Sequence, residues 1–147
     1  MKVHFRRSNL PGALLVQAAL FSRWSHVAIE IGDTVYDATM SRGVQSWPAA
    51  GYTDRYSETE TVELPGDETA ARDFLRRQLG KKYDWMALVA LPFRTTWQSP
   101  HRWFCSELVA KALSHAGVLS LPYKAWRVTP RDLHLVLRSL YHPRTTT

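Results

Sequence analysis

The pattern of hydrophobic and polar residues divides the chain into an early part with strand periodicity and a later part that is mostly helical. Short alternating runs, typical of half-buried strands, lie at residues 2–7, 26–31, 34–39 and 57–65. Helices are predicted at residues 11–24, 67–80, 83–91, 105–117 and 129–140. Strands that gather before helices predict an α+β fold. The length of 147 residues fits one domain, 1–147, with a frayed tail from about residue 142.

One stretch has the pattern of a β-hairpin with Gly32-Asp33 at its centre. If these two residues form a two-residue turn, the numbers of paired residues always sum to 65. Asp37 then lies on the same face as His26, on a diagonal of roughly 7–8 Å between backbones. A three-residue loop would turn Asp37 to the other face. The proximity of the two side chains therefore depends on this register.

The composition is that of an ordinary globular protein, with 45% hydrophobic and 22% charged residues. Its single cysteine cannot form an internal disulfide, and the spacings of zinc sites built from paired cysteines are absent. Lys and Arg outnumber Asp and Glu by 19 to 13, a net charge of +6 that favours anionic partners: nucleic acid, acidic lipid or a wall polymer. A well-solvated surface explains the same surplus. No specific nucleic-acid-binding motif is present.

The N-terminal residues lack the apolar run of a secretory signal before Pro11. The longest apolar stretches, at 12–21 and 85–93, are too short to span a bilayer. We therefore expect a cytoplasmic protein without a transmembrane segment, which could leave the cell by lysis or by a signal-independent route.

Cys105 lies on the apolar stripe of the predicted helix 105–117, where two interpretations compete. A cysteine on such a stripe can be a small core residue. In the first turn it could instead be a reactive thiol, because the free amides and the helix dipole stabilise a thiolate and an oxyanion. A helix that started earlier, at Ser99 with Pro100 in its first turn, would place the cysteine a turn too deep.

A thiol nucleophile needs a base and a group that orients the base. His26, at the start of its strand, is one candidate base, and Asp37 is the carboxylate that the hairpin register places near it. His101 is the rival because it lies four residues before Cys105. It could be the base, a substrate contact or an ordinary loop residue.

Four blocks, "SHVAIEIGDTVYDAT", "LGKKYDW", "WFCSELVAKAL" and "VTPRDL", together resemble the circularly permuted papain-like amidases of the NlpC superfamily. The YiiX/YaeF-like branch is the most similar, and the resemblance covers roughly residues 22–133. It implies a small antiparallel sheet packed against helices, with the nucleophile near a helix N-terminus.

The resemblance matches Cys105 to the nucleophile, His26 to the base and Asp37 to the third polar residue. Relatives more often have Glu or His at the third position, and Asp is shorter. Tyr83 matches an aromatic residue that the family often keeps near its active site, where it could donate a hydrogen bond to the substrate or oxyanion, or only pack. No metal or organic cofactor is implied.

The implied activity is that of a cysteine hydrolase that cleaves an amide, such as a cell-wall peptide, through an acyl-enzyme. One alternative is lipid acyl transfer or hydrolysis of a lipid amide or ester, with the apolar segment 85–93 and Trp97 and Trp103 as an acyl-binding surface. Core packing explains that apolar segment more simply. A second alternative is a non-catalytic binding module, for which the short Asp37 leaves room.

Overall fold

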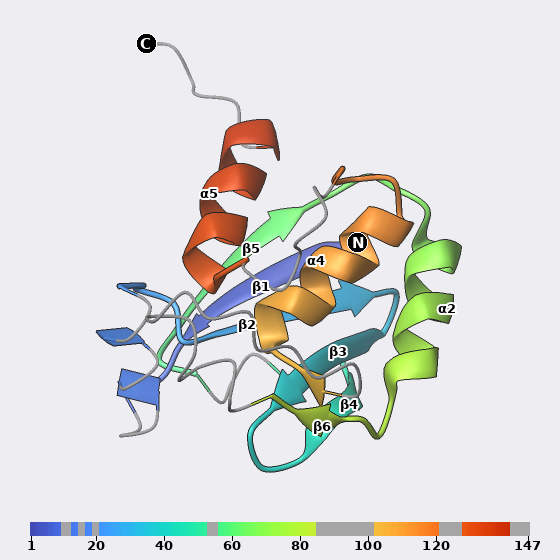
Figure 1. Ribbon diagram of the computed structural model, residues 1–147. Helices are drawn as coiled ribbons and strands as arrows, with labels where there is room; N and C mark the ends of the chain where they lie inside the picture. The colour runs from blue at the N-terminus through green and yellow to red at the C-terminus, as the bar shows by residue number, and fades with distance from the viewer. Residues whose placement is uncertain are drawn as a thin grey trace, which may run out of the picture.

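The computed structural model describes residues 1–9, 13–14, 17–18, 21–52, 56–84, 102–120 and 128–141. Its centre is an antiparallel sheet of five strands in the order β4-β3-β2-β1-β5 (Figure 1). These strands are β1 (Lys2–Arg7), β2 (His26–Ile31), β3 (Thr34–Thr39), β4 (Gly43–Pro48) and β5 (Glu58–Glu63). The four predicted strands are confirmed. β4 is an additional strand that the sequence pattern did not predict.

Three helices are described: α2 (Glu68–Gln78), α4 (Cys105–His115) and α5 (Pro130–Tyr141). Helix α4 packs against β2 and β3, α2 lies beside α4, and α5 contacts β5 (Figure 1). The predicted α+β class, with a small antiparallel sheet packed against helices, is confirmed.

The strand alternation places one apolar row of the sheet against α4. Val27 and Ile29 of β2 are fully buried on this side, as are Leu108 and Leu113 of α4. Burial of each such side chain stabilises the fold by roughly 1.5–3 kcal/mol relative to an exposed position. The sheet and α4 therefore form one packed unit, which fixes the start of the helix relative to the start of β2.

The helix ends follow the capping residues in the sequence. Asp67 accepts hydrogen bonds from the backbone amides of Thr69 (2.9 Å) and Ala70 (3.0 Å), so it is the N-cap of α2. At α5 the Thr129 hydroxyl accepts from the Asp132 amide at 3.1 Å, and Pro130 is the first helical residue. Both predicted starts are confirmed.

A short parallel pair, β6 (Lys82–Tyr83) and β7 (Arg102–Trp103), lies beside the main sheet. The prediction that a helix begins at Tyr83 is wrong at that residue, because Tyr83 pairs with Trp103 in this ladder. The approach of β6 to β4 is close. The Val44 amide donates to the Lys81 carbonyl at 2.9 Å, and a Cβ at Gly43 would overlap that oxygen.

Several expectations lie largely outside the described residues. Of the predicted helix 11–24, the described residues 13–14 and 17–18 are helical, whereas the described residues 21–24 are not, and Phe21 has a positive φ of 46°, so the prediction is wrong at that end. The apolar segment 85–93, His101 and the tail from residue 142 are not described. Among the described helices, none is long and apolar enough to cross a bilayer.

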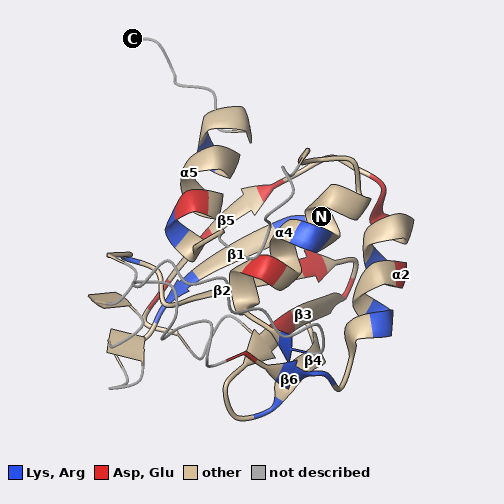
Figure 2. Cartoon of the chain, in the orientation of Figure 1, with Lys and Arg blue, Asp and Glu red and all other residues tan. Residues whose placement is uncertain are grey.

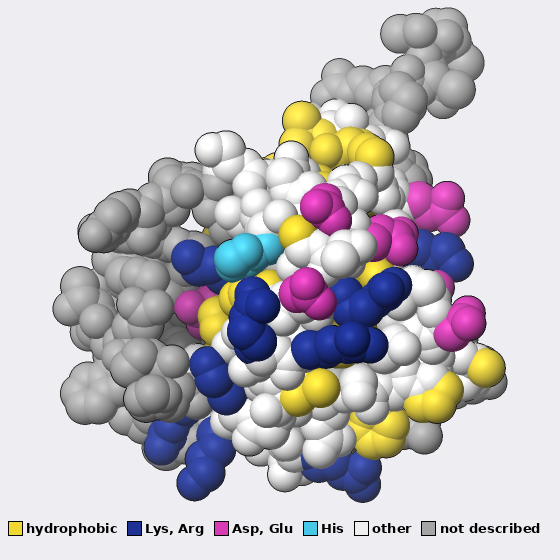
Figure 3. Space-filling model, turned by 90° about the vertical axis from the view of Figure 1, so that its right-hand side faces the viewer, with side chains coloured by type: hydrophobic (Ala, Val, Ile, Leu, Met, Phe, Trp, Pro, Cys, Tyr) yellow, Lys and Arg dark blue, Asp and Glu magenta, His cyan; other side chains and the backbone are white. Residues whose placement is uncertain are grey.

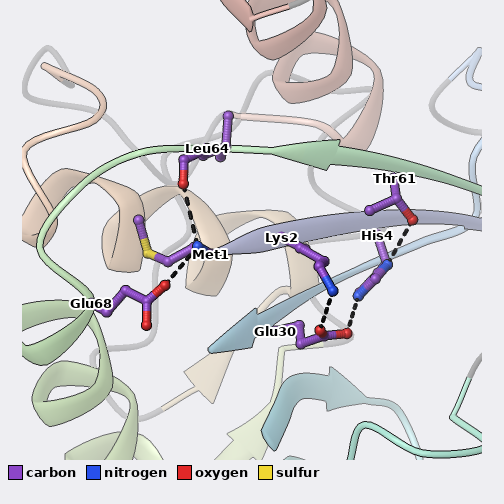
Figure 4. Close-up of polar contacts among 7 residues, drawn as sticks. All are labelled: Met1, Lys2, His4, Glu30, Thr61, Leu64 and Glu68. Carbon is purple, nitrogen blue, oxygen red and sulfur yellow. Dashed lines mark hydrogen bonds and ion pairs between the residues drawn. The ribbon is translucent and has the colours of Figure 1, made fainter. Parts of the chain in front are cut away.

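On the other face of the sheet, polar side chains of β1 and β2 form a hydrogen-bonded row (Figure 4). His4 bonds to the Thr61 hydroxyl through Nδ1 (2.9 Å) and to Glu30 through Nε2 (2.8 Å). Lys2 donates to the same Glu30 carboxylate at 3.0 Å. Burial lowers the pKa of His4 below its ordinary value, although the Glu30 carboxylate opposes this shift. The row satisfies the buried imidazole, which explains how β1 tolerates a histidine.

Candidate functional site

The β2–β3 hairpin brings His26 and Asp37 together. Ile31 pairs with Thr34, and Ile29 pairs with Tyr36, so the paired numbers sum to 65 as predicted. Gly32 has a positive φ of 60°, which suits the first central position of a two-residue turn. The His26 Nε2 atom lies 3.2 Å from Asp37 Oδ2. The register needed for this contact is therefore confirmed.

Asp37 is 2% exposed and is surrounded by hydrogen-bond donors. Trp47 Nε1 donates to its Oδ1 at 3.1 Å, and the Tyr52 hydroxyl donates to Oδ2. Burial by itself would raise the pKa of Asp37, but the bonds from His26, Tyr52 and Trp47 outweigh burial and leave the pKa below its usual value. The carboxylate is therefore ionised at neutral pH, although it is shielded from water.

His26 has the opposite shift. Burial tends to lower its pKa, but the hydrogen bonds to Asp37 and to the Cys105 side chain, with the charge of the thiolate, raise the pKa well above 6.5. Because Nε2 is directed at Asp37, Nδ1 is the ring nitrogen left to face the sulfur. The ring stacks on Tyr56 with an interplanar angle of 8° and a centroid distance of 6.0 Å. His26 is thus held between a carboxylate and a thiol, which together favour its protonated form.

Cys105 is the first residue of α4, and its side chain is 1% exposed. The chain before it is β7, so the alternative in which the helix starts at Ser99 is wrong. The N-cap residue, Phe104, makes no side-chain capping bond, which leaves the first-turn amides without a side-chain acceptor from that residue. Ser106 donates its hydroxyl to the Val128 carbonyl at 2.6 Å and so fixes the first turn.

Tyr83 is buried near the sulfur. Burial raises the pKa of Tyr83 well above 10, and the neighbouring Cys105 and Asp84 charges add to the shift. Its hydroxyl is therefore protonated and can donate a hydrogen bond. The ring also packs against Phe104, with the centroids 5.7 Å apart, so packing and donation are compatible. His101 lies outside the described residues, and its relation to Cys105 is not described.

Three residues of the site, Arg6, Tyr52 and Trp47, were not predicted from the sequence. Arg6 pairs with His26 across β1 and β2 and is completely buried. Its guanidinium lies 3.8 Å from the centre of the Tyr52 ring and donates to the Tyr52 carbonyl at 3.1 Å. This packing holds the ring whose hydroxyl reaches Asp37. The hydrophobic–polar alternation of residues 2–7 assigns Arg6 to one face of its strand, but this pattern does not identify the strand that pairs with it.

No protein-family model matches the chain, and no curated protein matches it either. A solved structure does: the crystal structure of the metalloprotein YiiX from Escherichia coli O157:H7. The TM-score is 0.59 at 19% sequence identity, over 97% of this chain and 82% of that one. At this identity the likeness concerns the fold, and the chain has a YiiX-like fold.

The described residues do not fit a metal centre. They include no group of three or more His, Cys, Asp or Glu side chains that could hold a metal ion. Both Asp37 oxygens already accept hydrogen bonds, and His26 Nε2 is directed at that carboxylate. The polar atoms of Asp37 and His26 are thus already engaged with each other and with Trp47, Tyr52 and Cys105.

Proposed function

We propose that the protein is a cysteine hydrolase in which Cys105 is the nucleophile, His26 the acid and base, and Asp37 the residue that positions His26. The main support is the position of the His26 ring. Its Nε2 atom lies 3.2 Å from Asp37 Oδ2, and the ring also interacts with the Cys105 side chain. A cation beside a thiol favours the thiolate, which is the attacking species. The YiiX-like fold is compatible with the resemblance to papain-like amidases of the NlpC superfamily and leaves that assignment a prediction.

The reaction begins when the Cys105 thiolate attacks the carbonyl carbon of an amide, forming a C–S bond and a tetrahedral oxyanion. The Cys105 backbone amide, at the positive end of α4, donates to that oxyanion. As the C–N bond breaks, the electron pair goes to nitrogen, and the imidazolium of His26 gives its proton to the leaving amine. An acyl-thioester remains on the enzyme.

Deacylation reverses the role of the imidazole. Neutral His26 takes a proton from water, the hydroxide oxygen attacks the thioester, and the C–S bond breaks to release a carboxylic acid. The thiolate and the imidazolium are restored. Asp37 keeps its charge throughout and stabilises the cationic imidazole, because its hydrogen-bond donors hold its pKa low.

The protonated Tyr83 hydroxyl is a second candidate donor to the oxyanion or to the substrate. The Tyr83 assignment is supported by the nearby Cys105, whose thiolate charge contributes to the raised pKa of Tyr83. Within the substrate class we favour an amide such as a cell-wall peptide. The lipid alternative depends mainly on the apolar segment 85–93, which is not described.

An acyl probe that reacts with active thiolates tests this proposal on the full chain. Because Cys105 is the only cysteine, labelling reports this residue alone, and Cys105→Ala gives the background. We expect the wild type to be labelled, His26→Ala to lose labelling, and the exposed-histidine control His115→Ala to keep it. Equal labelling of His26→Ala would contradict the assignment and direct attention to His101. Turnover of peptidoglycan fragments compared with phospholipid vesicles then separates amide from lipid substrates.

A further inference from the structure

A pocket of about 430 Å³ has Tyr83, the candidate oxyanion donor, in its lining. It is lined by residues 40–43 after β3, residues 80–83 at β6, and Arg102 of β7. Figure 2 shows Lys and Arg at β6 and in the loop next to it. The three segments are joined by backbone bonds: β6 pairs with β7, and Gly80 donates to the Val44 carbonyl at 3.0 Å. The walls of the pocket therefore come from hydrogen-bonded chain.

The pocket carries an unbalanced positive charge. Four of its nine lining residues are cationic, namely Arg42, Lys81, Lys82 and Arg102, and the lining contains no Asp or Glu. None of the ion pairs formed between described residues includes any of these four. Elsewhere, several basic side chains of the described residues do form ion pairs with carboxylates. On the α2 side of the molecule, acidic side chains lie close to the Lys and Arg side chains (Figure 3), and Arg72 approaches Glu68 at 3.9 Å.

A concave surface with charges of one sign concentrates its potential and attracts ions of the opposite sign. The cations belong to three separate segments and so approach a shared ligand from different directions. A single arginine can occupy both oxygens of a carboxylate, whereas a phosphate offers more acceptor oxygens and a second negative charge. Four unpaired cations therefore match a phosphate better than a lone carboxylate.

The pocket is also adjacent to the reaction centre. Tyr83 lines the pocket, and the Cys105 thiolate is among the charges that raise the pKa of Tyr83. Arg102 comes three residues before Cys105 and pairs with Lys82. Lys81 is held by a 2.7 Å bond from its Nζ to Gln78 Oε1. A group bound here would thus contact Tyr83, whose charge environment includes Cys105, and Lys81 is positioned in advance.

We propose that this pocket binds a phosphate group carried by the substrate, so that the bond cleaved at Cys105 lies close to a phosphate. That the bound molecule is a substrate rests on the proposed function. The pocket itself can be tested without turnover. Binding of inorganic phosphate to the full chain at constant ionic strength, followed by isothermal titration or amide chemical shifts, measures it directly.

Wild type and Cys105→Ala should bind inorganic phosphate saturably and with similar affinity. The Lys82→Gln/Arg102→Gln double variant should bind about 100-fold more weakly, or about tenfold for each charge-assisted bond removed. Arg76→Gln, an exposed charge change on α2 outside the pocket, is the control and should bind like the wild type. Circular dichroism and thermal melts establish that each variant is folded.

Equal binding by the double variant would overturn the pocket, as would a non-saturable response equal to that of chloride. Equal binding of succinate would overturn the preference for phosphate. Saturable phosphate binding without acyl labelling of Cys105 would support the phosphate pocket and contradict the proposed hydrolase function. Acyl labelling without phosphate binding would support the hydrolase function and contradict the phosphate pocket. Competition with inorganic phosphate by glycerol phosphate, and in parallel by phosphatidic acid in phosphatidylcholine vesicles, distinguishes a soluble phosphate ester from a lipid headgroup as the bound group.

Discussion

His26 Nε2 lies 3.2 Å from Asp37 Oδ2, across a hairpin whose turn is only two residues long. The contact joins an imidazole with a raised pKa to a carboxylate with a lowered pKa, so each group stabilises the charged form of the other. Since the Cys105 side chain also bonds to His26, the hairpin and the start of α4 meet in one charged cluster.

Asp37→Asn should lower the rate of Cys105 acylation by about two orders of magnitude or more, because the amide keeps the size of the side chain but cannot stabilise the imidazolium. Single-turnover acylation measured across pH is the test. The variant should also move the alkaline limb of the profile to lower pH, since His26 would lose the hydrogen bond that contributes most to its raised pKa and would give up its proton more readily. Asp33→Asn, in the exposed turn of the same hairpin, is the matched control. A rate equal to that of wild type in both variants would remove Asp37 from the mechanism.

Tyr52→Phe should reduce both stability and acylation rate. The hydroxyl bonds to Asp37 in a buried setting, and the loss of a bond to a charged group costs roughly 1.5–3 kcal/mol. Urea unfolding measures the free energy, and the pH profile of acylation measures the effect on His26. If the free energy of unfolding of the variant is no lower than that of wild type and the pH profile of acylation is unchanged, the Tyr52 hydroxyl does not stabilise the Asp37 carboxylate.

The stability contributed by His26 should depend on pH with a defined sign. Its folded-state pKa is raised above the unfolded value of 6.5, so folding favours the protonated ring. This contribution is fully present below pH 6.5 and is lost as the pH rises through the raised folded-state pKa. His26→Gln should therefore destabilise the fold more at pH 6 than at pH 9. Urea midpoints at both pH values test this, and a larger loss at pH 9 would reverse the assigned shift.

Gly43 and Gly80 provide a matched pair of backbone tests beside the basic pocket. Both have positive φ values, 71° and 81°, so Gly80→Ala should cost roughly 1–2 kcal/mol from conformation alone. Gly43→Ala adds an overlap with the Lys81 carbonyl oxygen and should cost about 1–3 kcal/mol more. Chemical denaturation of both variants measures the difference. Equal losses would mean that β6 does not pass so close to β4.

The hairpin contact could be predicted from sequence because its register is set locally, by the two residues Gly32-Asp33 between alternating runs. The ends of α2 and α5 were predictable for the same reason, since Asp67 and Thr129 cap helices through nearby amides. Local chemistry thus specified the strands, the helix starts and one of the two contacts of His26.

The long-range contacts could not be derived in this way. Arg6 reaches its partner His26 across residues 8–25, and no turn signal fixes that pairing. The start of α4 was ambiguous because the preceding β7 is only two residues long and pairs with a strand 20 residues earlier. The meeting of His26 with Cys105 was therefore predicted from the family resemblance, whereas periodicity alone left the cysteine as an ordinary core residue.

The most direct test is the pH dependence of alkylation by iodoacetamide at the single cysteine, in wild type and in His26→Ala. If His26 and Cys105 form a cation–thiolate pair, the wild type should react rapidly below pH 7, where an ordinary thiol reacts slowly. His26→Ala should lose this reactivity at low pH and react appreciably only at alkaline pH. Identical profiles for the two proteins, or a wild-type cysteine that reacts only after unfolding, would contradict the proposed nucleophile.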